Sequence, residues 1–222
     1  MTSDLTADPS PQRYPLRKAH ARRTLAAIVE AASELFAAQG YTATTILDVS
    51  KRAGVGRATV FTAVPGGKPE LLKMARDRAL AGDDDDVPVS ERSWSVAALA
   101  QTDPAELLRI KASNYRDMLQ RVAGIEAALE AGAESAPELV ELRRTATEQR
   151  RFGARAVANR LAELTPLRAG LSVQSAADTI TVLISSGTYR LLTEDYGWTP
   201  DKYEEWLTGQ LFACLLPAGV AR

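Results

Sequence analysis

The chain has 222 residues, 45% of them hydrophobic and 25% charged, which is enough for one or two globular domains with a buried core. No apolar run approaches the roughly 20 residues that span a membrane, and residues 1–16 lack the apolar segment of a signal peptide. A single cysteine excludes an intramolecular disulfide, and a single histidine leaves little for a metal site or a catalytic triad. We therefore expect a cytoplasmic protein with no metal, no cofactor and no membrane partner.

The net charge of −1 conceals an uneven distribution along the chain. Residues 11–68 hold nine Lys or Arg and three Asp or Glu, a net charge of +6. Residues 73–222 hold 18 basic and 22 acidic residues, a net charge of −4. Such asymmetry indicates that only the N-terminal part is suited to bind a polyanion.

Residues 1–15 contain three prolines among small polar residues, which predicts a disordered arm. Beyond the arm, apolar residues recur every three or four positions along most of the chain, the pattern of amphipathic helices. The expected helices begin with Arg17–Gly40 and continue over about 46–53, 57–63, 68–81, 94–101, 104–124 (with a break near Gly124), 135–164, 172–195 and 200–216. No stretch shows the sustained alternation of a strand, so the chain is predicted to be all-α.

The two short helices at about 46–53 and 57–63, joined by a turn at Gly54, predict a helix-turn-helix whose second helix can enter the DNA major groove. Arg57 is the one long side chain in the exposed half of that second helix, and it can pair with guanine O6 and N7. The candidate DNA-binding residues are Thr44, Thr45, Arg57, Ala58, Thr59, Thr62, Ala63 and Lys68. The two threonines can offer groups to a phosphate or serve only as helix caps. We interpret Val60, Phe61 and Val64 as core residues.

The segment from Arg17 to Leu72 contains RRTLAAIVEAASELFAAQGYTATTILDVSKRAGVGRATVFTAVPGGKPELL and resembles the TetR family of bacterial transcription regulators. The specific pieces are Phe36, Gly40-Tyr41, Thr44-Thr45-Ile46, Asp48-Val49, Ala53-Gly54-Val55 and Thr59-Val60-Phe61, followed by a lysine that opens the next helix. The resemblance implies a helix-turn-helix DNA-binding domain followed by a larger helical domain for ligand binding and dimerisation. We expect the divisions at residues 1–15, 16–66 and 67–222, with the helix from about 68 as the connector.

Three positions depart from the family pattern. The family usually has a tyrosine, whose hydroxyl reaches a phosphate, where this chain has Phe61, so that contact should be missing. It favours an aromatic residue or histidine where Ala63 stands. The lysine comes one residue later than in the family because of the extra glycine in Gly66-Gly67. Whether the Lys68 side chain still points towards a DNA phosphate is therefore open.

The resemblance also implies a small-molecule pocket among the C-terminal helices and a dimer formed by the last two. Pocket candidates are the large residues on apolar helix faces, each of which could equally be ordinary core: Trp94, Tyr115, Met118, Leu119, Phe152 and Tyr189. Interface candidates are small or apolar residues that could form a four-helix contact or pack within one subunit: Ala177, Ile184, Gly187, Trp206, Leu207 and Leu211.

These features favour a homodimeric repressor that a small-molecule effector releases from a near-palindromic operator. An activator of the same family, or a regulator without an effector, remains an alternative, because the N-terminal half does not distinguish either of them from a ligand-released repressor. A helical enzyme is a remote alternative, because Gly54-Val55-Gly56 lacks a dinucleotide fingerprint and Gly66-Gly67-Lys68 lacks a complete phosphate-binding loop. We therefore expect no catalytic residues.

Overall fold

The computed structural model describes residues 13–83, 85 and 87–218. Within these residues the fold is helical and contains no strand, which confirms the predicted all-α class. The α-helices are α1 (Arg13–Ala43), α2 (Ile46–Arg52), α3 (Arg57–Ala63), α4 (Gly67–Ala81), α5 (Ser93–Leu99), α6 (Pro104–Ala133), α7 (Val140–Leu164), α8 (Val173–Leu183), α9 (Ser186–Arg190) and α10 (Pro200–Leu215). Short helical turns occur at η1 (Val89–Glu91), η2 (Pro137–Leu139) and η3 (Leu191–Asp195). None of the described helices is long and apolar enough to cross a membrane.

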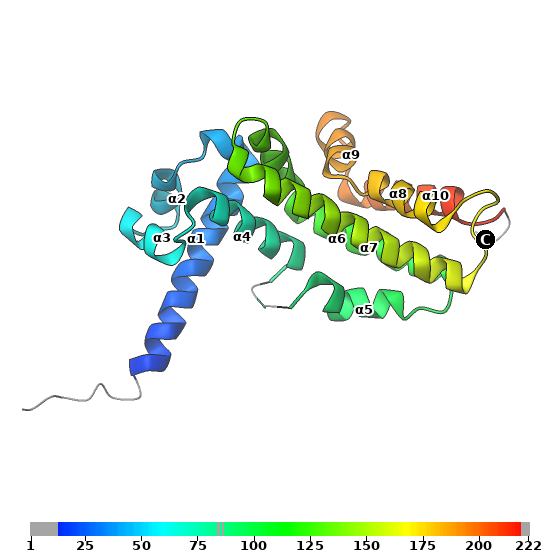
Figure 1. Ribbon diagram of the computed structural model, residues 1–222, viewed down its shortest axis with the longest axis horizontal. Helices are drawn as coiled ribbons and strands as arrows, with labels where there is room; N and C mark the ends of the chain where they lie inside the picture. Colours follow the sequence, from blue (N-terminus) through cyan, green and yellow to red (C-terminus); the bar gives the residue numbers. More distant parts are fainter. Residues whose placement is uncertain (1–12, 84, 86, 219–222) are drawn as a thin grey trace, which may run out of the picture.

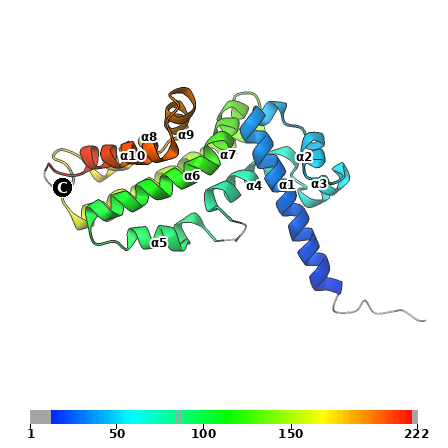
Figure 2. The ribbon, with the colours of Figure 1, turned by 180° about the vertical axis from the view of Figure 1, so that it is seen from behind.

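Helices α2 and α3 lie at one end of the molecule, beside α1, and the helices from α5 onward form an elongated body (Figures 1 and 2). Helix α4 lies between the two parts (Figure 1). Helix α6 organises the body because it packs against α1 and α4 near one end and against α5, α7, α9 and α10 along its length. The short helices α2 and α3 are thus tied to the body through α1 and α4.

Two clusters of buried apolar residues meet along α6. The first joins α1–α4 to the second half of α6 and includes Phe36, Val60 and Leu129. The second joins the first half of α6 to α7–α10 and includes Leu119 and Tyr203. The first cluster contains residues from before and after position 66, where the sequence predicts a domain boundary. That boundary therefore stays a prediction.

Helix α6 continues through Gly124, where the sequence predicts a break. A Cβ atom at this position would lie 2.9 Å from Cβ and 3.2 Å from Cα of Ala37 in α1. Gly124 therefore permits the close approach of α1 to α6. The prediction of a break was wrong because a glycine inside a helix can serve packing instead of termination.

The expected helix over 172–195 is divided at Ser185, whose backbone is extended with φ −70° and ψ 145°. The Ser185 side chain accepts a hydrogen bond from the backbone N–H of Thr188 at 3.1 Å, so it caps a new helix, α9.

At the other end of the chain, α1 begins at Arg13, inside the predicted arm. The rest of that arm, residues 1–12, lies outside the described residues.

Candidate functional site

Helices α2 and α3 form a compact pair around a left-handed glycine. Gly54 has φ +67°, and the backbone N–H of Val55 donates to the carbonyl oxygen of Ser50 at 3.0 Å, which closes the turn. Val49 of α2 and Val60 of α3 are 0% and 1% exposed, in the cluster that they share with α1. The pair is thus a rigid helix-turn-helix in which Gly54 supplies the backbone conformation that other residues rarely adopt.

The first turn of α3 carries Arg57, Ala58 and Thr59 on the surface, and Thr62 is exposed one turn later. The Thr62 hydroxyl donates to the carbonyl oxygen of Ala58 at 2.9 Å. The Arg57 guanidinium has no ion-pair or hydrogen-bond partner among the described residues. The exposed face of α3 therefore presents one unpaired cation among small side chains, which suits close contact with a polyanion.

The two threonines before α2 have different environments. Thr45 is exposed and forms a capping box: its hydroxyl oxygen accepts from the Asp48 N–H at 3.1 Å, and its own N–H donates to the Asp48 carboxylate at 3.3 Å. The Thr45 hydroxyl also donates to that carboxylate at 2.6 Å, which lowers the pKa of Asp48. Thr44 is only 1% exposed, and its hydroxyl donates to the Gly40 carbonyl at 2.8 Å. The Thr44 hydroxyl is thus used within the chain, and a contact between Thr44 and a phosphate stays a prediction.

A shallow recess of about 490 Å³ lies between α3 and the start of α4. It brings together Arg57 and Lys68, which are separate in the sequence, and its lining is Thr42, Thr44, Thr45, Ile46, Leu47, Arg57, Phe61 and Lys68. The Lys68 ammonium lies 4.1 Å from the centre of the Tyr41 ring and donates to the Thr42 carbonyl at 3.4 Å. Partial burial lowers the pKa of Lys68. Two cations thus border one open concavity on the face that α3 exposes.

Two residues of α3 take the reverse of their expected roles. Phe61, interpreted as core, is 47% exposed and lines the recess, because its position on α3 faces away from Val60. Ala63, proposed as a DNA contact, is partly buried and packs against the core beside Val64. Val60 and Val64 are buried as expected.

A cavity of about 1270 Å³ lies in the body of the molecule. Its walls come from α1, α4, the segment before α5, α5 itself, α6, α7 and the junction of α8 with α9. Five of the six predicted pocket residues line it: Trp94, Tyr115, Met118, Leu119 and Phe152. The sixth, Tyr189, does not line it; its ring packs edge-on against Tyr203 at 4.8 Å in the core. Phe152 is 67% exposed, so it lies at an open part of the wall.

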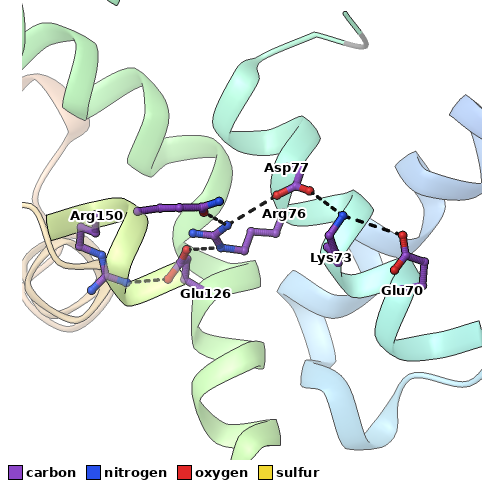
Figure 3. Close-up of polar contacts among 7 residues, drawn as sticks. Glu70, Lys73, Arg76, Asp77, Glu126 and Arg150 are labelled. Carbon is purple, nitrogen blue, oxygen red and sulfur yellow. Dashed lines mark hydrogen bonds and ion pairs between the residues drawn. The ribbon is translucent and has the colours of Figure 1, made fainter. Parts of the chain in front are cut away.

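A polar cluster joins α4 to α6 and α7 at the wall of this cavity (Figure 3). The buried Glu126 of α6 accepts from Arg76 Nε of α4 at 2.7 Å and from Arg150 of α7 at 2.8 Å, so both carboxylate oxygens are used. Arg76 also donates to the side-chain oxygen of Gln149 at 2.8 Å and lies 3.6 Å from Asp77. These contacts attach α4, the helix that also carries Lys68 of the recess, to α6 and α7 at the wall of the cavity.

Residues 28–72, which span the second half of α1 through α4, match the family model described as bacterial regulatory proteins, tetR family. This segment is therefore a tetR-family domain. The match covers the helix-turn-helix and the start of α4, the elements that form the recess. No curated protein sequence matches the chain significantly.

Solved structures share the fold over most of the chain. NalD of Pseudomonas aeruginosa, described as the secondary repressor of the MexAB-OprM multidrug efflux pump, aligns with TM-score 0.65 and 20% identity over 88% of this chain and 98% of its own. A putative transcriptional regulator from Saccharomonospora viridis in complex with choline aligns with TM-score 0.66 and 18% identity over 89% and 98%. SmeT in complex with triclosan aligns with TM-score 0.60 and 17% identity over 89% and 93%. At these identities the likeness concerns the fold.

The candidate residues for a dimer interface fall into two groups. Four of them are 0–3% exposed within the single chain and pack into its second cluster: Ala177, Ile184, Leu207 and Leu211. Gly187 is exposed and Trp206 is partly buried. The first four are therefore core residues of the subunit, which is the alternative considered for them. Val182 of α8, 65% exposed, is an apolar surface residue that sequence reasoning missed; it lies two positions from the buried Ile180 and thus on another face of the helix.

Proposed function

We propose that this TetR-family protein is a homodimeric repressor that binds a near-palindromic operator and leaves it when a small-molecule effector binds. The observation that carries the proposal is the unpaired Arg57 at the start of α3, which shares one recess with Lys68. An exposed guanidinium at the N-terminal end of a recognition helix can read guanine, and a nearby ammonium can contact a phosphate.

The cavity supports the effector part of the proposal. Its wall contains Arg76 and Asp77 of α4, the helix that also carries Lys68 of the recess. A ligand that contacts Glu126 or its partners would act on the helix that supports the DNA-binding surface, so the affinities for ligand and for DNA would be linked reciprocally. The SmeT and Saccharomonospora viridis structures contain small molecules, triclosan and choline respectively.

The proposed dimer rests on α8 and α10, which pack together on one side of the body. Val182 of α8, Gly187 of the adjoining α9 and the partly buried Trp206 of α10 are residues that a second subunit could cover. A dimer would place two copies of α3 about 34–36 Å apart, which requires an operator with two half-sites one helical turn apart.

The primary test is binding to duplexes from the region upstream of the gene, measured by fluorescence anisotropy over a salt series. Because each phosphate contact releases counterions, the logarithm of the affinity should fall steeply and linearly with the logarithm of salt concentration. Specific duplexes should bind at least about a thousandfold more tightly than random duplexes. A flat salt response or equal affinity for random DNA would refute DNA-sequence recognition.

Replacing Arg57 by Ala should reduce the preference for the operator over a variant duplex by about 1–3 kcal/mol, since one bidentate contact with guanine is lost. The matched control is Arg52→Ala in α2, because Arg52 is exposed but already pairs with Glu34 at 2.5 Å. Lys68→Ala should instead weaken binding to all duplexes alike. Competition anisotropy with operator and single-base variants measures both effects; equal losses for Arg57→Ala and Arg52→Ala would contradict the role of Arg57.

Replacing Phe61 by Tyr should strengthen binding to every duplex severalfold. The ring is 47% exposed in the recess beside Arg57 and Lys68. A hydroxyl there would add a donor for a phosphate, which should stabilise the complex by about 0.5–1.5 kcal/mol. Phe152→Tyr on α7 is the control, as this ring is exposed on the body. Anisotropy titrations at one salt concentration suffice, and an unchanged or weaker affinity of Phe61→Tyr would show that the ring does not face the backbone of DNA.

A further inference from the structure

The four charged residues that are buried in the described part of the chain, Arg76, Arg92, Lys111 and Glu126, all line the large cavity. Arg76 and Glu126 pair with one another, and Arg92 pairs with Asp83. Lys111 of α6 is 6% exposed and has no carboxylate or hydrogen-bond partner among the described residues. It is therefore a buried cation of the cavity wall for which the described residues supply no counter-charge.

The surroundings of Lys111 are aromatic. Its ammonium lies 4.8 Å from the centre of the Tyr115 ring, one turn along α6, and 5.9 Å from that of Trp94 in α5. These rings stabilise a cation, but they leave its N–H groups without acceptors. Burial lowers the pKa of Lys111 to about 8, so the side chain remains mostly protonated at neutral pH.

The Tyr115 hydroxyl is a second unsatisfied group at the same place. It is buried and has no hydrogen-bond partner, and Tyr115 also lines the cavity. Buried polar groups without partners are rare in folded proteins and are often explained by a missing ligand or water. Lys111 and Tyr115, two lining residues one turn apart on α6, thus each carry a donor without an acceptor among the described residues.

Much of the wall beside these donors is apolar, although Ser95, Asn114 and Ser186 also line it. Along α6, Met118, Leu119 and Val122 continue the face that carries Lys111 and Tyr115. The facing elements add Leu99, Ala154, Val157 and Ile184. A molecule that fills this space must have a largely hydrophobic body.

We propose that the effector of this cavity is an apolar molecule with one anionic oxygen group, such as a carboxylate, which binds the Lys111 ammonium and accepts a hydrogen bond from the Tyr115 hydroxyl. This inference rests on the proposed function, in which the cavity is the effector site. The anion supplies the counter-charge that Lys111 lacks and an acceptor for each donor. A neutral ligand supplies no charge, and a cation is repelled by the buried ammonium.

The test compares head groups on identical apolar bodies. Dodecanoate, dodecanol and dodecyltrimethylammonium form one series, and 2-naphthoate and 2-naphthylmethanol form a second, each titrated below its micelle concentration by calorimetry and by Trp fluorescence. We expect at least one acid to bind about tenfold or more tightly than its alcohol, and the trimethylammonium compound to bind most weakly. Lys111→Met should weaken the acid about thirtyfold, Lys111→Arg should retain most of its affinity, and Tyr115→Phe should cause a smaller loss.

Lys202→Met is the matched control, because Lys202 also lies over an aromatic ring, that of Trp198 at 4.4 Å, but on the surface. It should leave acid binding unchanged. The inference is overturned if neither acid binds, if acids and alcohols bind equally, or if Lys111→Met and Lys202→Met behave alike. Release of DNA is measured separately: an acid that binds at Lys111 without releasing DNA would refute the proposed function and leave the inference standing.

Discussion

Replacing Glu126 by Gln is expected to lower the free energy of unfolding by about 3–5 kcal/mol. Glu126 is 4% exposed and its two oxygens accept from Arg76 and Arg150. The substitution leaves the guanidinium of Arg76, itself 3% exposed, with only the half-exposed Asp77, 3.6 Å away, as a counter-charge. Burying an uncompensated cation costs more than the pair contributes. Urea denaturation followed by circular dichroism measures the difference.

The matched control is Glu141→Gln in α7. Glu141 also pairs with an arginine, Arg144, at 2.5 Å, but both side chains are more than half exposed, so the expected loss is below about 1 kcal/mol. The double variant Arg76→Met/Glu126→Leu should recover most of the loss, because it removes the buried charge together with its partner. Equal effects of Glu126→Gln and Glu141→Gln would show that the buried cluster does not stabilise the attachment of α4.

Replacing Lys111 by Met is expected to raise the free energy of unfolding by about 3 kcal/mol at pH 7. Burial lowers the pKa of Lys111 from its ordinary value of 10.5 to about 8, and each pKa unit corresponds to about 1.4 kcal/mol. Methionine has a similar length and carries no charge, so it removes this cost. A stabilising substitution in the wall of a binding cavity is the expected sign of a residue kept for its function.

The pH dependence gives a second check on the same pair of proteins. Between about pH 8 and 10.5 the folded protein loses the Lys111 proton while the unfolded chain still holds it, so the wild type gains stability with rising pH. The difference between wild type and Lys111→Met should therefore be largest below pH 8 and shrink towards pH 10.5. Tyr115 does not ionise in this range because burial raises its pKa. Denaturation at pH 7 and pH 10 measures the change; a constant difference would contradict the buried, uncompensated ammonium.

The sequence predicted the elements whose signals are local. The glycine at position 54 and the proline at 104 mark ends of helices, and the apolar period identifies faces such as Val49 with Val60, so the helix-turn-helix and most helices agree with the structure. Gly124 misled because a glycine that ends a helix and one that admits a neighbouring helix look alike in a single sequence. The break at Ser185 was missed because serine inside an apolar period signals a cap only weakly.

The residues of the candidate sites were predictable only where the signal is local in the sequence. Five pocket residues follow from large side chains on apolar faces, but the exclusion of Tyr189 depends on its contact with Tyr203, which no local pattern contains. The buried pair Arg76 and Glu126 was missed altogether. Like the partly buried Arg150, these residues look like ordinary surface residues until three helices bring them together. Lys111 could have been suspected, because it lies four residues before Tyr115 and three after Leu108 on an apolar face.

The contact between Gly124 and α1 connects the wall of the large cavity to the helix that supports α2 and α3. Gly124 touches Ala37 of α1, and it follows Val122 of the cavity wall by only two residues, less than one turn of α6. Since close-packed interiors yield little, a displacement of that wall must be passed to α1, whose far side supports α2 and α3. The cavity and the proposed DNA-binding surface thus both depend on the α1–α6 contact, and a side chain larger than hydrogen at position 124 would push these two helices apart.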